Sequence, residues 1–371
     1  MKQLNFRLVQ AVKVFDPLWR LFALLPRRNK NEIIFNILVV DLHLIGDIVM
    51  LQPLLAAIRF KYPSAYIALV AGSWAKQILA NENSVDEYIQ FNAAWVIKKR
   101  NLIKSFSSTF GLIKNLRKRE WYLCIDVRGD IRNILIMFFA KGAKRVGYDF
   151  MGGKALLTDV VYDDGTLKSI IYHHEQIAKE LTVSEQFFPF IPRLNLSPIE
   201  TESAALIESF WGFHFGASLP LRRFPVEEAI KVLNFAASST DNKIVLFDSP
   251  DIAEFNKEVV GRINQIAKSR LLLWKGGLRD FIVYVSRAEV MFTMDSGPGH
   301  IASALGVKTY VIFGPNISKN TAPRGDNVRI IERAPALPCQ PCDQHRCTNE
   351  NSRQSCLRGL FDEYDFTKVG S

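Results

Sequence analysis

The sequence predicts an α/β protein made of two successive domains, each with a mostly parallel sheet and helices on both of its faces. Three observations lead to this class: a length of 371 residues, apolar runs that alternate with helix-like segments, and glycine turns after several of those runs. A chain of this length can bury two separate cores. Regular alternation of strand and helix favours an open parallel sheet, because each helix carries the chain back to start the next parallel strand.

The first half of the chain contains a first series of alternating elements. Residues 33–40 are almost continuously apolar, as in a buried parallel strand, and a loop at 41–46 leads into a helix at 47–60. Further strands are expected at 66–70, 88–91, 121–127 and 145–147, and further helices at 74–81, 98–119, 132–140 and 172–181. Residues 182–196, with two prolines, are predicted to be irregular.

A second series follows in the other half. Strands are expected at 209–215, 243–248, 271–274, 290–294 and 307–313, and helices at 225–237, 255–268 and 281–288. The predicted organisation is a basic amphipathic extension (1–30), a first domain (31–185), a linker (186–200), a second domain (201–335) and a cysteine-rich tail (336–371). Two doubly wound domains predict a cleft between them, with ligands at the carboxyl ends of the strands.

The segment 294–306, MDSGPGHIASALG, is the most informative stretch of the chain. It predicts a strand end, a glycine turn and a short helix, with Asp295 and Ser296 placed to cap the free N–H groups of the first turn. Gly297 and Gly299 lack a Cβ atom and would let a ligand approach the backbone. A helix N-terminus attracts a diphosphate, and His300 lies one turn further on. We interpret this segment as a phosphate-binding turn.

The loop after the first strand holds polar residues at the position that open α/β sheets favour for ligands. His43, Gly46 and Asp47 lie there, and the Asp47 carboxylate could take a proton from an attacking hydroxyl. Asp47 could equally serve as the cap of the following helix, and the two roles are compatible. Asp126 and Arg128 end another strand at the same edge, where a structural ion pair is the simpler interpretation.

The second domain offers a possible anion clamp after its first strand. Ser218 follows a Gly-Ala pair, and Arg222 comes shortly before the next helix. Backbone N–H groups, a hydroxyl and a guanidinium at one strand end can bind a phosphate, although solvated arginines are an equally good interpretation. The chain has no Walker sequence, no G-x-G-x-x-G and no G-x-S-x-G, which argues against a P-loop enzyme, a typical dehydrogenase and an α/β-hydrolase.

Charge and cysteine content suggest further partners. The net charge of +10 is concentrated in residues 1–30 and 98–119, which favours an anionic membrane surface or an acidic glycan; no nucleic-acid motif accompanies it, so nucleic acid is not expected. The apolar spacing in 6–25 fits either an interfacial helix or one that packs on the first domain. The tail cysteines permit a zinc or iron site, a disulfide or a reduced loop; they are Cys339, Cys342, Cys347 and Cys356.

Taken together, these motifs resemble glycosyltransferase family 9, the ADP-heptose:lipopolysaccharide heptosyltransferases and their relatives. The similarity lies in GDIVMLQP at 46–53, GASLPLRRFP at 216–225, DSGPGHIA at 295–302, FGP at 313–315 and the cysteine-rich tail. The resemblance implies a GT-B fold and inverting transfer of a sugar, with the nucleotide sugar (ADP-heptose or a related donor) in the second domain and the acceptor in the first. No metal cofactor is required by this resemblance.

The resemblance also implies roles for individual residues. Asp47 would be the general base, while His43, Gly46 and Arg128 would contact the acceptor. The donor would be bound by Ser218, Arg222, Asp295, Ser296, Gly297 and His300. The implied acceptor is a lipopolysaccharide core or another lipid-linked or phosphorylated glycan, and the implied location is the cytoplasmic face of the bacterial inner membrane. A sugar-nucleotide epimerase of the same fold and a non-catalytic nucleotide-sugar scaffold are the alternatives.

Overall fold

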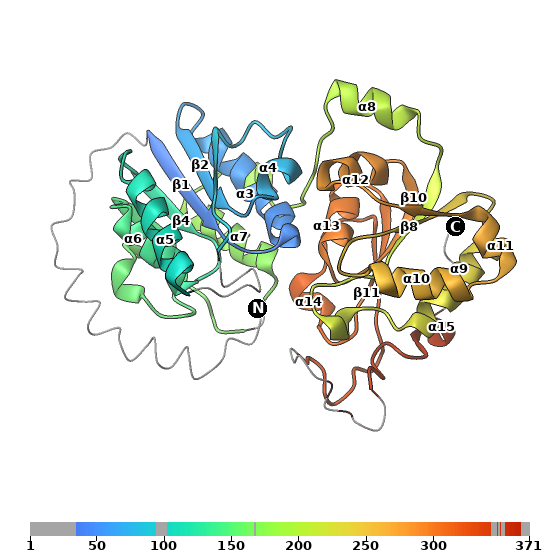
Figure 1. Ribbon diagram of the computed structural model, residues 1–371. Helices are drawn as coiled ribbons and strands as arrows, with labels where there is room; N and C mark the ends of the chain where they lie inside the picture. Colours follow the sequence, from blue (N-terminus) through green and yellow to red (C-terminus); the bar gives the residue numbers. More distant parts are fainter. Residues whose placement is uncertain are drawn as a thin grey trace. The chain divides into compact units, whose positions relative to one another are not determined.

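The structure is a computed structural model that describes residues 35–93, 102–166, 168–342, 347, 349 and 353–364 (Figure 1). The chain divides into two compact units, Met1–Ile191 and Pro192–Ser371. The expected amphipathic extension, residues 1–30, lies outside the described residues. Among the helices that the structure describes, none has the length and apolar character needed to cross a bilayer.

The first unit contains a six-stranded parallel sheet in the order β3-β2-β1-β4-β5-β6. Its strands are β1 (Asn36–Asp41), β2 (Tyr66–Ala71), β3 (Glu87–Gln90), β4 (Leu123–Asp126), β5 (Lys144–Gly147) and β6 (Asp159–Val160). Its α-helices are α3 (Ile45–Lys61), α4 (Ala75–Ile78), α5 (Leu102–Leu116), α6 (Ile131–Phe139) and α7 (Ile170–Glu180). The strand order reverses between β1 and β4, and a crevice for ligands is expected at such a switch point.

The second unit repeats this plan with the sheet order β12-β11-β10-β7-β8-β9. Its strands are β7 (Phe210–His214), β8 (Lys243–Phe247), β9 (Leu271–Trp274), β10 (Ala288–Met294), β11 (Lys308–Ile312) and β12 (Val328–Ile331). Its α-helices are α8 (Pro198–Ala205), α9 (Val226–Ser239), α10 (Ala253–Arg262), α11 (Gln265–Arg270), α12 (Leu278–Val285), α13 (Gly297–Ala304), α14 (Ser318–Thr321) and α15 (Leu360–Glu363). Here the order reverses between β7 and β10. The predicted α/β class with two parallel sheets is confirmed.

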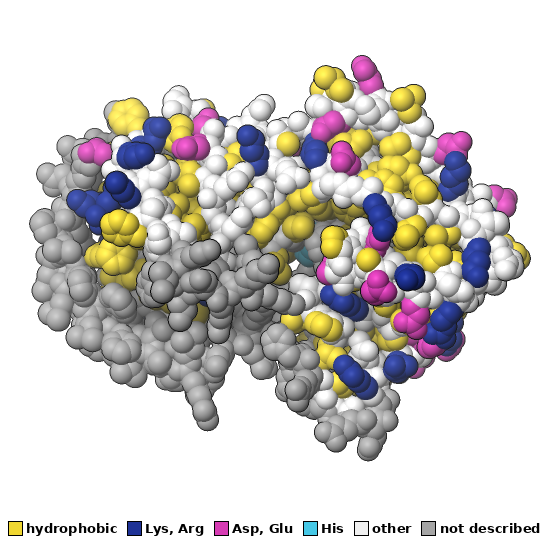
Figure 2. Space-filling view, in the orientation of Figure 1, with side chains coloured by type: hydrophobic (Ala, Val, Ile, Leu, Met, Phe, Trp, Pro, Cys, Tyr) yellow, Lys and Arg dark blue, Asp and Glu magenta, His cyan; other side chains and the backbone are white. Residues whose placement is uncertain are grey.

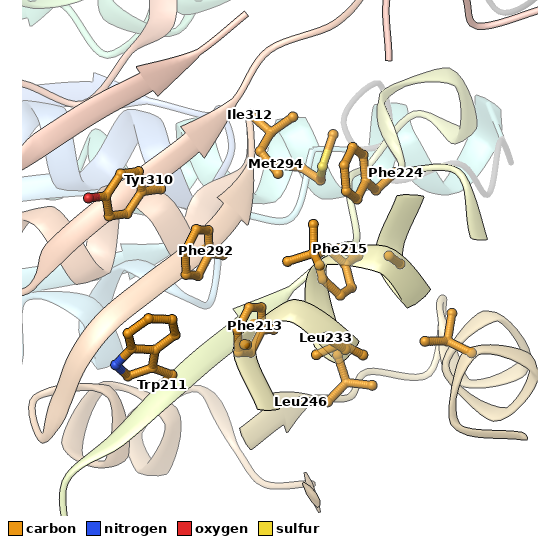
Figure 3. Packing of buried hydrophobic residues seen from close by; sticks show 14 of the residues in the cluster. Trp211, Phe213, Phe215, Phe224, Leu233, Leu246, Phe292, Met294, Tyr310 and Ile312 are labelled. Atoms are coloured by element: carbon orange, nitrogen blue, oxygen red, sulfur yellow. The ribbon is translucent and has the colours of Figure 1, made fainter. Parts of the chain in front are cut away.

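A row of aromatic rings joins the central strands of the second sheet (Figure 3). Phe213 on β7 stacks on Phe292 of β10 with ring centroids 5.0 Å apart, and Phe292 stacks on Tyr310 of β11 at the same distance. All three side chains are buried. Each such pair contributes about 0.5–1.5 kcal/mol beyond the burial of its area. The row fixes β7, β10 and β11 relative to one another, and the loops at their ends carry the expected donor residues.

Three expectations about helices need correction. The single helix expected at 255–268 is two helices, because the side chain of Asn264 accepts the N–H of Ala267 and starts α11. Helix α3 begins at Ile45, so Asp47 is a residue of its first turn and Leu44 is the N-cap. A short helix, α8, begins within the predicted linker, where Ser197 and Glu200 form a capping box.

The packing of α7 on α3 predicts a loss of stability in acid. His174 on α7 is fully buried, and its Nδ1 lies 3.1 Å from the carbonyl oxygen of Met50 on α3. Burial lowers the pKa of His174 from 6.5 to about 4. Between these two values the unfolded chain binds a proton that the folded chain does not, so folding stability decreases as the pH falls from 6.5 to 4, by roughly 3 kcal/mol in total.

Urea unfolding at several pH values between 7.5 and 4.5 would measure this dependence. His174→Leu removes the titrating group, and its stability is expected to change less with pH than that of the unmodified protein, whatever its stability at pH 7.5. An identical pH dependence in the two proteins would contradict the assignment to His174.

Candidate functional site

The Asp47 carboxylate has two functions in the structure of its loop. Its Oδ2 accepts the backbone N–H of Leu44 at 2.9 Å, which caps α3 from the first turn. Its Oδ1 lies 3.0 Å from Nη1 of Arg128, and both side chains are 13% exposed. The pairing brings the loops after β1 and β4 together at the switch point of the first sheet. The carboxylate is thus held in one place, with a small part of its surface open to a ligand.

His43 lies in the same loop and is oriented by a buried carboxylate. Asp41, the last residue of β1, is fully buried, and its Oδ1 accepts the backbone N–H of His43 and lies 3.1 Å from His43 Nδ1. An ionised carboxylate can only accept, so the contact assigns the proton to Nδ1 and leaves Nε2 as an acceptor. The His43 side chain is 26% exposed. Its Nε2 can therefore accept a hydrogen bond from a hydroxyl group.

The prediction of an ion pair between Asp126 and Arg128 is wrong, because the Arg128 guanidinium pairs with Asp47. The buried Asp126 carboxylate accepts the backbone N–H groups of Arg128 and Asp130 and the amide of Asn133, at 3.2, 3.0 and 2.9 Å. Burial raises the pKa of Asp126 to about 7 in spite of these hydrogen bonds. Asp126 shapes the turn after β4, and the turn presents the Arg128 guanidinium to Asp47.

A cavity of about 220 Å³ lies beside Arg128 at the end of β4. Phe150 forms part of its wall and stacks on Tyr148, with ring centroids 4.6 Å apart. Gly129 has φ +66°, and a Cβ atom there would lie 2.6 Å from the Phe150 ring, so glycine is required for this wall. Lys168 and His173 also line the cavity. Asp163 also lines the cavity and lies 3.1 Å from His173, so the positive side chains of the lining are Arg128 and Lys168. An aromatic face beside these two side chains suits a sugar ring that carries an acidic group.

In the second unit, the prediction that the side chains of Asp295 and Ser296 cap the N-terminus of α13 is wrong. Ser296 occupies the N-cap position, but its hydroxyl donates to the carbonyl oxygen of Met294 at 3.1 Å. The Asp295 carboxylate points to the loop after β11, where it accepts from Asn316 and Thr321. No side-chain hydrogen bond caps α13 at Ser296, so the Gly297 N–H and the positive end of the helix dipole can bind an anion, while Pro298 has no N–H and that of Gly299 donates to the carbonyl oxygen of Ser296 at 3.1 Å.

The remaining expected donor residues surround the same edge of the sheet. Arg222, at the end of a 3₁₀ turn after β7, has its Nη1 3.4 Å from Asp295 Oδ2, which links the ends of the neighbouring strands β7 and β10. Ser218 is exposed in the same loop, and His300 is buried in α13. Gly297 is the first residue of α13. Arg223 contacts Asp251 instead, at 3.2 Å.

Gly299 has a different reason to be glycine than the one expected. A Cβ atom at Gly299 would lie 2.8 Å from the hydroxyl oxygen of Thr293 on β10. The glycine therefore allows α13 to pack closely on its own sheet, and no ligand needs to occupy that space.

The tail cysteines lie near one another. Cys356 is buried, and its pKa is raised to about 11. Burial is the main cause, and the nearby thiols of Cys339, Cys347 and Cys342 contribute less. All four are free, and within the described residues no three side chains are grouped to hold a metal ion. The tail also supports the donor loops, since Gln354 donates to the carbonyl oxygens of Leu221 and Arg223.

Asn316 and Thr321 were not predicted from the sequence as residues of this site. Asn316 stands directly after the Gly-Pro pair at 314–315, which is typical of a turn, but a hydrogen-bonding role for its side chain has no local pattern. Thr321 ends the four-residue helix α14, which was not expected at all. Their signal is three-dimensional: β11 lies next to β10, so the loop after β11 reaches Asp295.

Comparisons with known proteins identify the family of this chain. The family described as Glycosyltransferase family 9 (heptosyltransferase) matches residues 109–353, about two thirds of the chain. The lipopolysaccharide heptosyltransferase 2 of Salmonella typhimurium is 26% identical over 321 residues, which is 80% of this chain and 87% of that protein. The enzyme of the same name from Escherichia coli K12 is 25% identical over 317 residues, with the same coverage of both.

Solved structures share the fold. The structure of E. coli ADP-heptose lps heptosyltransferase II gives a TM-score of 0.68 at 22% identity and covers 81% of this chain and 92% of that one. The E. coli heptosyltransferase WaaC with ADP gives 0.65 at 16% identity, with 80% and 92% covered. At these identities the structures support the two-sheet GT-B architecture alone. The family match adds the class: this chain is an enzyme that belongs to glycosyltransferase family 9.

Proposed function

We propose that the protein is an inverting glycosyltransferase that moves a sugar, heptose from ADP-heptose in the first instance, onto a lipopolysaccharide core or related lipid-linked glycan. The observation that carries the donor half is the meeting of Arg222 with the uncapped N-terminus of α13 at the ends of β7 and β10. A guanidinium and a helix N-terminus together neutralise a diphosphate. The heptosyltransferase names of the relatives suggest the sugar and its nucleotide.

In the proposed reaction, Asp47 takes the proton of the acceptor hydroxyl. The oxygen forms a bond to the anomeric carbon while the bond from that carbon to the diphosphate breaks, and the electron pair leaves with the diphosphate. Attack from the face opposite the leaving group inverts the anomeric carbon. Arg222 and the positive N-terminal end of α13, with the Gly297 N–H, stabilise the charge that develops on the diphosphate, and this step needs no metal ion. Ser218 and His300 would add further contacts to the donor.

The acceptor is proposed to bind to the first unit, in the cavity beside Arg128. Asp47 pairs with Arg128, so a sugar in that cavity would have a hydroxyl group close to the proposed base. Lys168 and Arg128 favour a phosphate or carboxylate on the sugar. His43 would accept a hydrogen bond from a neighbouring hydroxyl through Nε2.

The lipid anchor of the proposed acceptor suggests that the enzyme acts at the cytoplasmic face of a bacterial inner membrane. The exposed side of α5 and the residues after it support this location, because Lys114 and Lys118 are exposed there and Phe110 is 72% exposed. Basic and apolar side chains also adjoin one another on the visible face of the first unit (Figure 2). Such a surface is attracted to anionic lipid head groups.

Calorimetric titration with ADP, UDP, GDP and CDP, each with and without magnesium, tests the donor class. We expect ADP to bind selectively, because the names of the relatives suggest this nucleotide. We expect it to bind without magnesium, because the Arg222 side chain supplies positive charge for the diphosphate. A turnover assay with ADP-heptose then needs an acceptor. Product formation without acceptor would favour the epimerase, and ADP binding without any turnover would favour the scaffold; absence of binding to all four nucleotides would contradict the proposal.

A further inference from the structure

His214 ends β7, one of the two strands at the switch point of the second sheet. Side chains alternate along a strand, so His214 lies on the face opposite to Phe213 and Phe215, which belong to the hydrophobic core shown in Figure 3. Its neighbour on β10 is Thr293, and a Cβ atom at Gly299 of α13 would lie 2.8 Å from the Thr293 hydroxyl oxygen. His214 is therefore on the face of the sheet that α13 covers, at the edge where α13 begins.

The imidazole ring of His214 is held by the chain around it. A Cβ atom at Gly216 would lie 2.9 Å from Cε1 of His214 and 3.0 Å from Cδ1 of Ile252, so the backbone of the loop after β7 packs closely against the ring. Nδ1 is buried and has no hydrogen-bond partner in the described part of the chain. The residue as a whole is partly exposed, so Nε2 is the ring nitrogen that a ligand can reach.

The two acidic groups whose charges act on His214 have other partners. They are Asp248 and Asp251, in the loop after β8. Asp248 Oδ2 lies 2.9 Å from Nζ of Lys275, and Asp251 Oδ2 lies 3.2 Å from Nη2 of Arg223. Burial lowers the pKa of His214 from 6.5 to about 4, so the ring is neutral at pH 7. A neutral imidazole offers at Nε2 either one N–H or one lone pair.

The position of His214 matches the part of a nucleoside diphosphate that adjoins its phosphates. The proposed diphosphate site is at the N-terminus of α13, directly after β10, and His214 is on the strand next to β10. On the other side of β10, Asn316 and Thr321 from the segment after β11 donate to the Asp295 carboxylate at 2.9 and 3.1 Å. We therefore expect the nucleoside on the side of β7 and β8, where the ribose is the group next to the diphosphate. A ribose hydroxyl both donates and accepts, so it can bind Nε2 in either tautomer.

We propose that His214 binds a ribose hydroxyl of the nucleoside diphosphate through Nε2 and so favours ribonucleotide donors over deoxyribonucleotide donors. The inference rests on the proposed function, because it needs the diphosphate of the donor at α13. It adds a contact from β7 itself, outside the segments that carry the family resemblance. A phosphate oxygen is a poorer partner for this ring, since it can only accept and a neutral imidazole brings no charge to it.

His214→Leu tests the proposal by removing both ring nitrogens. Loss of one neutral hydrogen bond is expected to weaken ADP binding by about 3- to 10-fold in calorimetry. Binding of inorganic pyrophosphate, which has no ribose, should change by less than about twofold in the same variant. His214→Gln places an amide group near the position of Nε2 and should restore part of the ADP affinity.

The analogues 2′-deoxy-ADP and 3′-deoxy-ADP each lack one ribose hydroxyl and identify the one that is bound. The unmodified protein should bind one of them about 3- to 10-fold more weakly than ADP. His214→Leu should bind that analogue and ADP with equal affinity, because the interaction is already lost in the variant.

Trp211→Phe is the matched control on the same strand. Trp211 also has a buried ring nitrogen without a partner among the described residues, but its side chain lies in the core on the other face. Its ADP affinity should stay within about twofold of the unmodified value. If His214→Leu leaves ADP affinity unchanged, or weakens the binding of ADP, both deoxy analogues and pyrophosphate by the same factor, the ribose contact is overturned and the proposed function stands. If the unmodified protein binds neither ADP nor pyrophosphate, the proposed function itself fails and the inference fails with it.

Discussion

Replacing Asp47 by Asn is expected to lower kcat by about 10²- to 10⁴-fold, the range that a general base contributes. The amide has no charge to take up the proton of the acceptor hydroxyl. It keeps the size of the carboxylate, and its oxygen can still accept the N–H of Leu44 that caps α3. Because Asp47 belongs to the first unit and the donor residues to the second, ADP affinity measured by calorimetry should change by less than about twofold. The loss should therefore appear in single-turnover measurements of the chemical step.

A control is needed because Asp47→Asn also breaks the ion pair with Arg128. Asp86→Asn breaks a comparable ion pair in the same unit, with Arg59, away from the loop after β1. Its kcat is expected to be within about twofold of the unmodified value, since surface ion pairs contribute little. Turnover by Asp47→Asn at the rate of the Asp86→Asn variant would exclude Asp47 as the base and direct attention to His43, whose Nε2 is the other proton acceptor of that loop.

The sequence predicts the sheets well because burial determines them. Runs such as those of β1 and β10 are apolar on both faces, which is the signature of a strand covered by helices on both sides, and only the order of the strands was left undetermined. Helix ends were less well predicted. Asn264 divides one apolar pattern into α10 and α11 by a cap whose signal is a single side chain.

The sequence could place these candidate residues relative to the strands. Arg128 comes from the loop after β4 and Asp47 from the first turn of α3, which follows the loop after β1, and the parallel sheet brings those strand ends together. Their partners were not predictable: Arg128 pairs with Asp47, 81 positions away, and not with the nearer Asp126. The reason is that Asp126 is already engaged by backbone N–H groups of its own turn, and only the folded structure reveals this. The same holds for Thr321, which reaches Asp295 from a helix too short to leave a periodic pattern.

Replacing Arg222 by Ala is expected to lower kcat/KM by about 10²- to 10³-fold, as for the loss of one group that stabilises charge in a transition state. The charge on the leaving diphosphate is greatest as the bond to the sugar breaks, so the effect on kcat should exceed the effect on ADP affinity. Arg222→Lys should recover only part of the activity, because an ammonium group cannot form the paired bonds of a planar guanidinium.

Arg223 is the matched control: it neighbours Arg222, but its guanidinium is engaged by the carbonyl oxygen of Ala217 and by Asp251. Arg223→Ala should change kcat/KM much less than Arg222→Ala when both are assayed at saturating acceptor. Equal losses in the two variants would mean that the basic character of the loop matters and the position of Arg222 does not, because only Arg222 lies beside Asp295 at the N-terminus of α13.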